Sequence, residues 1–111
     1  MRFDMKILKF RSHLATAILD GRKTSTWRLF DDKDLSVGDI LELEDSDSRK
    51  KFANAKIIAV REKTLGQVEE SDFNGHDAYS SPGEMLKSFQ EYYGNHVTLE
   101  TPVKIVEFKV F

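Results

Sequence analysis

Runs of β-branched and aromatic residues separated by polar turns are the feature that most restricts how this chain can fold. They occupy residues 5–10, 24–28, 40–44, 52–63 and 101–111, and such residues favour strands. Helical signals occur in two segments, too few for the alternating strands and helices of a doubly wound parallel sheet. We therefore expect an α+β domain with a mostly antiparallel sheet of five or six strands and two main helices. Closing that sheet into a β-barrel would remove its edges.

The two helical segments have recognisable start signals. Residues 12–19 should form a short helix in which Ser12 is the capping residue. The segment "SPGE" (residues 81–84) is a capping box with proline at the first helical position. The second helix should run from there to about Tyr93 and end at Gly94.

Length and composition limit the class of protein. With 111 residues the chain has room for one core, so residues 1–111 should form a single domain. The absence of cysteine excludes disulfides and cysteine metal sites. The histidines lack the spacing of paired ligands, so we expect no metal and no cofactor, with a loop site of Asp72, His76 and Asp77 as the alternative. Without a signal peptide or a membrane-length apolar run, we expect a complete, monomeric, cytoplasmic protein.

Charge is distributed unevenly along the chain. The first 30 residues contain seven Arg or Lys residues and two Asp residues, a net charge of +5, whereas the whole chain has a net charge of −2. A basic segment on an acidic protein can attract a polyanion at one place on its surface.

The densest polar pattern in the chain is "GRKTSTWR", residues 21–28. If this segment is a strand, Thr24, Thr26 and Arg28 lie on one face, where an arginine fork and two hydroxyls can recognise a carbonyl, a phosphate or a base edge. Lys23 comes just before the strand and could reach the same site, and neighbouring cations such as Arg22 would favour its neutral form. The same spacing also fits an ordinary sheet surface with solvated cations.

The segments "LDGRKTSTWRL" and "LSVGDILEL" resemble the ASCH domain family, which is marked by a Gly-Arg/Lys-Lys-Thr-x-Thr-x-Arg motif followed by a Val-Gly-Asp turn. The likeness continues through "GHDAYSSPGEMLKSFQEYYG" to "TPVKIVEFKVF" and so covers nearly the whole chain. It implies a PUA-like β-barrel with helices packed at its sides and a cleft implicated in RNA binding.

The resemblance also implies a possible enzyme activity. Small bacterial members of the family are amidohydrolases that remove acetyl from N4-acetylcytidine with a lysine, a threonine and a glutamate. The lysine and threonine match Lys23 and Thr26. The acidic residue matches Asp77 best, with Glu84 as the alternative.

Two functions therefore remain open. In a binding module, Lys9, Arg11, Lys23 and Arg28 would rim a cleft for RNA or a modified nucleoside, and Tyr79 or Trp27 would stack on a base. Trp27 is the sole tryptophan of a small domain, which favours a place in the core instead. In an enzyme, Lys23 would activate Thr26 or water, and Asp77 would move the proton. A protein-interaction module is a third possibility.

Overall fold

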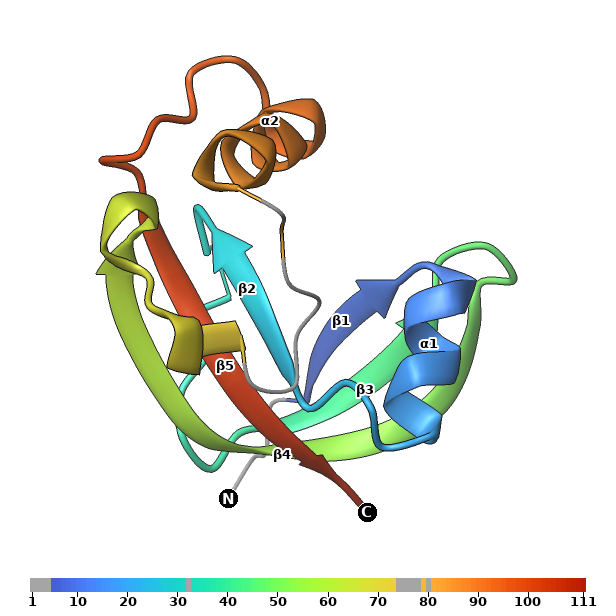
Figure 1. The fold of residues 1–111 in the computed structure, drawn as a ribbon. Helices are drawn as coiled ribbons and strands as arrows, with labels where there is room; N and C mark the ends of the chain where they lie inside the picture. The colour runs from blue at the N-terminus through green and yellow to red at the C-terminus, as the bar shows by residue number, and fades with distance from the viewer. Residues whose placement is uncertain (1–4, 32, 74–78, 80) are drawn as a thin grey trace.

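The computed structural model describes residues 5–31, 33–73, 79 and 81–111. Within these residues one sheet is accompanied by two α-helices and two short 3₁₀ helices (Figure 1). In chain order the elements are β1 (Lys6–Phe10), α1 (Ser12–Leu19), β2 (Ser25–Leu29), β3 (Ile40–Asp45), β4 (Lys50–Thr64), η1 (Leu65–Gln67), η2 (Glu70–Phe73), α2 (Pro82–Tyr93) and β5 (Pro102–Val110).

The five strands form one mixed sheet in the order β1-β3-β4-β5-β2. The β3–β4, β4–β5 and β5–β2 pairs are antiparallel, and β1 pairs with β3 in parallel. The sheet curls into a half-barrel whose edge strands are β1 and β2 (Figure 1). The predicted α+β class is confirmed. The predicted mostly antiparallel barrel is observed as this curled, partly open sheet.

Bulges help the long strands to bend. The register of β3 against β4 shifts between Leu43 and Glu44, and that of β4 against β5 shifts between Ile57 and Ala59. An extra residue at such a position increases the local twist and bends the strand. The curl of the sheet therefore has a cause in the register of its ladders.

The core divides into two clusters. The first core cluster lies where α1 packs against β1, β3 and the neighbouring strands of the sheet. The second lies where α2 packs against β2 and β5. Buried members of the first include Leu8, Phe10, Ile18, Leu43 and Phe108. Those of the second include Trp27, Met85, Phe89, Val97 and Ile105, so the prediction of a core Trp27 is confirmed.

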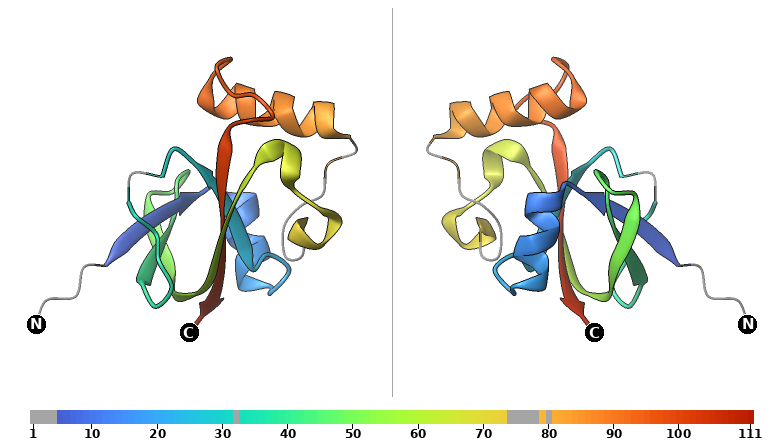
Figure 2. Two further views of the ribbon diagram at one scale, coloured as in Figure 1. Left: turned by 90° about the vertical axis from the view of Figure 1, so that its left-hand side faces the viewer. Right: turned by 90° about the vertical axis from the view of Figure 1, so that its right-hand side faces the viewer.

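Helix α2 begins and ends as the sequence predicts. The Ser81 side chain accepts a hydrogen bond of 3.1 Å from the Glu84 backbone N–H, and Pro82 occupies the first turn. The helix ends at Gly94, whose φ of 115° is a conformation that favours glycine. Figure 2 shows α2 lying across one end of the sheet, on the side away from the C-terminus.

The prediction that Ser12 caps α1 is wrong. Arg11 occupies the capping position without a side-chain hydrogen bond. The Ser12 hydroxyl donates to the Asp45 carboxylate at 2.7 Å, and the Ser12 backbone N–H donates to Asp47 at 2.9 Å. The parallel pairing of β1 with β3 places these carboxylates beside the start of the helix, where they compete successfully for Ser12.

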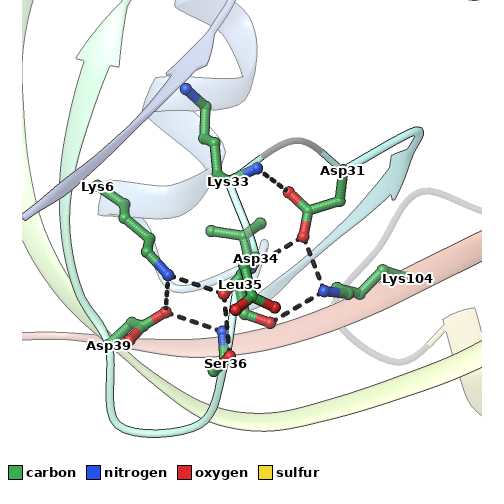
Figure 3. A network of polar contacts seen from close by, with 8 residues as sticks. All are labelled: Lys6, Asp31, Lys33, Asp34, Leu35, Ser36, Asp39 and Lys104. Atoms are coloured by element: carbon green, nitrogen blue, oxygen red, sulfur yellow. Dashed lines mark hydrogen bonds and ion pairs between the residues drawn. The ribbon is translucent and has the colours of Figure 1, made fainter.

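The loop between β2 and β3 is held by two lysines (Figure 3). Lys104 donates to the Asp31 carboxylate at 2.7 Å, and Lys6 donates to Asp39 at 2.7 Å. Burial alone would raise the pKa of Asp31, but hydrogen bonds from Lys104 and from the backbone of Leu35 and Lys33 hold it below its usual value. Both ends of the loop are thereby held to the sheet, one to β5 through Lys104 and the other to β1 through Lys6.

Candidate nucleotide-binding cleft

A cavity of about 460 Å³ opens between β1, α1, β2 and α2. Its apolar wall comes from both core clusters, since Phe10 and Leu14 belong to the first and Trp27 and Phe89 to the second. Figure 1 shows β1 and β2 diverging between the two helices. The cleft therefore lies at the boundary between the two cores, on the open side of the half-barrel.

Local backbone geometry brings Lys23 into this cleft. After α1, Gly21 adopts a φ of 79°, and the backbone N–H groups of Arg22 and Lys23 both donate to the Ala17 carbonyl, at 2.9 and 3.1 Å. This tight helix end turns the chain directly into β2. Lys23 is 7% exposed and Thr26 is 5% exposed, so both are buried polar residues of the cleft wall.

Arg28 connects the two edge strands of the sheet. From β2, its Nε donates to Thr26 Oγ1 at 3.2 Å, and its Nη2 donates to the Lys9 carbonyl of β1 at 3.4 Å. The guanidinium carbon also lies 5.1 Å from the centre of the Phe10 ring, a cation–π contact. Burial lowers the pKa of Arg28, and the nearby Tyr93, Tyr92 and Asp31 oppose that shift. Arginine stays protonated in proteins, so this group is a fixed cation in the cleft.

Six of the residues predicted for a site lie together in this cleft: Lys9, Arg11, Lys23, Thr26, Arg28 and Tyr79. Arg22 and Thr24 do not line it. Arg22 is exposed and forms an ion pair of 3.1 Å with Asp20, and Thr24 is an exposed residue that precedes β2. Thr24 instead accepts a backbone hydrogen bond of 3.0 Å from Phe108.

Of the two acidic candidates, Asp77 and Glu84, only Glu84 belongs to the described residues. Asp77, like His76, lies outside the described residues. Glu84 is exposed in the first turn of α2, where its backbone N–H donates to Ser81, and it does not line the cleft. Glu91 does line it, from the following turns of α2.

The known proteins that this chain resembles are similar to it in structure. No protein-family model matches the sequence, and a search of curated proteins finds no match. A solved DUF984-family protein of Enterococcus faecalis V583 has a TM-score of 0.80 and 17% identity, covering 99% of this chain and 82% of that one. The ASCH domain from Lactobacillus crispatus JV V101 has a TM-score of 0.75 and 16% identity, covering 96% and 79%. The ASCH protein from Zymomonas mobilis has a TM-score of 0.69 and 11% identity, covering 95% and 66%.

This chain has the fold of an ASCH domain. The sequence resemblance and the structural likeness agree on that fold. At these identities the likeness concerns the fold alone, and the chemistry of the cleft has to be argued from its own residues.

Sequence reasoning missed one wall of the cleft in this ASCH fold. Ser88, Glu91 and Tyr92 project into it from α2, and His13 does so from α1. The three α2 residues have the i, i+3, i+4 spacing of a single helix face. That spacing was a usable signal, but nothing in the sequence showed which element the face would meet.

In the described part of the chain, no group of three or more potential metal ligands is close enough to hold an ion. Asp72, one member of the metal alternative, accepts hydrogen bonds from Arg61 and Lys63 instead, at 3.2 and 2.8 Å. Neither of the described α-helices has the length and apolar character that crossing a membrane requires.

Proposed function

We propose that this protein is an ASCH-domain protein that binds single-stranded RNA, with one nucleotide seated in the cleft. The observation that carries the proposal is the placement of Lys9, Arg11 and Arg28 in one cavity with the aromatic side chains of Tyr79 and Tyr92. Unpaired RNA bases are recognised by stacking on aromatic rings, and phosphates by Lys and Arg. A cavity of about 460 Å³ is of the size that holds small organic ligands.

The cleft offers separate places for the parts of a nucleotide. Lys9 and Arg11 are exposed at the rim, where cations can meet phosphates without losing their own hydration. Arg28 lies deeper and presents a planar donor group, suited to a base edge or a phosphate. Glu91 would accept a hydrogen bond from a base amino group. The basic rim belongs to the N-terminal segment of net charge +5.

The salt dependence of RNA binding tests this proposal. Fluorescence anisotropy with a short labelled RNA should give weak binding whose log affinity falls with log salt concentration at a slope of about −2, as expected for three neutralised phosphates. The double variant Lys9→Ala/Arg11→Ala should flatten that slope. A matched variant, Lys56→Ala/Lys109→Ala, removes two exposed lysines that do not line the cleft and should leave it unchanged. An affinity independent of salt, or equal effects of the two double variants, would contradict the proposal.

A second candidate function uses the same cleft for hydrolysis of N4-acetylcytidine. The observation that favours it is that Lys23 and Thr26, the two residues matching the motif, are both buried in the cleft wall. Attack of water on the acetyl carbonyl would release acetate and cytidine, with the exocyclic nitrogen of cytosine taking up a proton as the amide bond breaks. Attack of the Thr26 hydroxyl would release cytidine in the same way and leave an acetyl ester on Thr26, which water would then hydrolyse to acetate. Arg28, which already donates to Thr26 Oγ1, would stabilise the developing oxyanion.

Acetate release from the nucleoside tests this second candidate. Lys23→Arg should abolish release because a guanidinium cannot act as a base. Thr26→Val should abolish it because the hydroxyl is lost, whereas Thr26→Ser should keep part of it if that hydroxyl is the nucleophile. The proton donor can be sought by comparing Asp77→Asn with Glu91→Gln, and Glu84→Gln serves as a control outside the cleft. No release by the unmodified protein at high concentration would leave RNA binding as the function.

A further inference from the structure

We infer that RNA extends beyond the cleft over an aromatic strip of Tyr92, Tyr93, Phe30 and His96, which binds the base next to the one in the cleft. This inference rests on the proposed RNA binding and specifies its substrate class: a strand of at least two nucleotides rather than a free nucleoside. The strip is one continuous series of rings. The ring centres lie 5.1 Å apart for Tyr92 and Tyr93, 5.9 Å for Tyr93 and Phe30, and 5.2 Å for Phe30 and His96.

The strip begins inside the cleft and ends on the surface. Tyr92 and Tyr93 line the cleft, and Arg28 is close enough to both for them to influence its pKa. Tyr93 is half-buried, and its hydroxyl accepts a hydrogen bond of 3.5 Å from the Leu29 backbone N–H. A base in the cleft and a base on the strip would therefore be neighbours along one strand, with Tyr93 between them.

Two large rings of the strip are exposed. Tyr92 is 67% exposed and Phe30 is 56% exposed. Phe30 also has a φ of 52°, a left-handed conformation that is unusual for a bulky residue. Strained backbone of this kind clusters at active sites and ligand-binding sites.

The far end of the strip has a defined geometry. The His96 ring packs on Phe30 and lies so near Gly94 that a Cβ there would approach its Cε1 and Nδ1 atoms to 3.0 Å. Glycine at this position, required by the end of α2, therefore also leaves space for the ring. His96 is exposed but seated between Phe30 and the Gly94 backbone.

The electrostatic surroundings of the strip combine several cations with the exposed carboxylate of Glu91, which also lines the cleft. The carboxylate beside Phe30, that of Asp31, is paired with Lys104 at 2.7 Å and so is compensated. The cations of the cleft continue from Arg28 to Lys9 and Arg11. An aromatic surface joined to a basic groove is the combination with which proteins bind single strands, because any base can stack and any phosphate can be neutralised.

Oligonucleotide length and base content provide the test. At fixed salt, we would compare cytidine monophosphate, a four-nucleotide cytidine RNA, and the same RNA with abasic sites at all positions but one. The full tetranucleotide should bind at least about tenfold more tightly than the abasic form, which carries the same phosphates. The abasic form isolates the contribution of stacking from that of charge.

Variants then locate the effect. Phe30→Ala/His96→Ala should lower the tetranucleotide affinity about tenfold and leave the monophosphate affinity unchanged. Phe111→Ala, which removes an exposed phenylalanine that is 70% exposed and lies outside the strip and the cleft, should change neither. Thermal unfolding of each variant checks that the fold is retained.

Several results would overturn the inference. Equal affinities for the full and abasic RNA, or an unchanged tetranucleotide affinity in the strip variant, would show that bases do not stack there, even with cleft binding intact. If the strip variant instead altered self-association in sedimentation and left RNA affinity alone, the strip would be a protein interface. If the unmodified protein bound neither the RNA nor cytidine monophosphate, both the proposed function and this inference would be wrong.

Discussion

At the scale of single residues, one arginine links the two edge strands of the sheet at the open side of the half-barrel. Arg28 starts on β2, bonds to Thr26 beside it and reaches the Lys9 carbonyl on β1. Lysine would not be an equivalent replacement, because its compact ammonium lacks the planar fork of donors that reaches both acceptors while lying near the Phe10 ring. Arg28, which the sequence pattern predicts to contact a ligand, therefore also has a structural role.

Phe30 allows a test of backbone strain. At a φ of 52°, Phe30→Gly should be more stable than Phe30→Ala by about 1 kcal/mol, because glycine adopts left-handed conformations without cost. Both variants lose the same ring, so their difference reports the backbone. Urea denaturation measures it. The same pair at Lys87, in the middle of α2, should show the opposite order, with glycine less stable by about 1 kcal/mol. The same order at both positions would argue against strain at Phe30.

The cleft could be predicted from the sequence only in part. The alternation of side chains along a strand correctly grouped Thr26 with Arg28, and the position of Lys23 just before the strand placed it at the same site. Thr24 lies outside the cleft: it is exposed and precedes the strand, which starts at Ser25, one residue later than expected. Residues of α2 that line the cleft could not be assigned, since their partners come from segments far away in the sequence.

At the scale of elements, a buried carboxylate joins η2 to β4. Asp72 is 2% exposed and accepts hydrogen bonds from Arg61, from Lys63 and from the Glu69 backbone. Burial alone would raise the pKa of Asp72, but these hydrogen bonds and the charge of Lys63 hold it below the usual value. The contact holds η2 against β4.

Asp72→Asn should therefore make stability less dependent on pH. A folded-state pKa below the unfolded one means that the contribution to stability is full above the unfolded pKa, about 3.9, and is lost as pH falls through the folded pKa. At pH 7 the variant should lose about 2 kcal/mol, since Lys63 and Arg61 lose a charged acceptor. Below the folded-state pKa of Asp72 the two proteins should converge. Urea denaturation across this range measures both effects.

The exposed pair of Asp20 and Arg22 provides the control for that experiment. Asp20→Asn should change the free energy of unfolding by less than about 0.5 kcal/mol at pH 7, because an exposed ion pair contributes little. A constant difference between Asp72→Asn and the unmodified protein at every pH would mean that the Asp72 charge is not what stabilises this contact.

Elements whose signals are local were predictable, and those whose partners are distant were less so. The N-terminal cap of α2 needs Ser81, Pro82 and the backbone N–H of Glu84, all within four residues, and it is present. The Ser12 prediction failed because Asp45, on another strand, competes for the hydroxyl. The parallel pairing of β1 with β3 was missed for the same reason, since it joins segments separated by α1 and β2.

At the scale of the whole molecule, the two cores share one strand, β5. Residues of β5 enter both clusters: Val106 and Phe108 pack in the first, and Val103 and Ile105 in the second. Strand β5 therefore connects the two sides of the cleft, and β1 and β2 are the edges of the sheet. Changes in the width of the cleft would be accommodated by bending of β4 and β5.

Hydrogen exchange should show this division. Amides shared between β4 and β5 should exchange most slowly, because their opening requires both cores to separate, and those of β1 and β2 should exchange faster. Adding RNA should slow exchange in β2 and in the half of α2 that faces the cleft, while the hairpin between β3 and β4 stays unchanged. Uniform protection across all five strands, or protection of the hairpin by RNA, would contradict this arrangement.

The position of β5 in the sheet also has a consequence for biosynthesis. This strand comes last among the five in the chain, yet it lies between β4 and β2, pairing Ser25 with Glu107. A ribosome that has made β1 to β4 therefore holds a nascent chain in which β2 has no neighbour and one side of β4 is unpaired. Unpaired strand edges are sites of aggregation. Translation through β5 should be the step at which this chain becomes independent of chaperones, and stalling before Pro102 should leave it dependent on them.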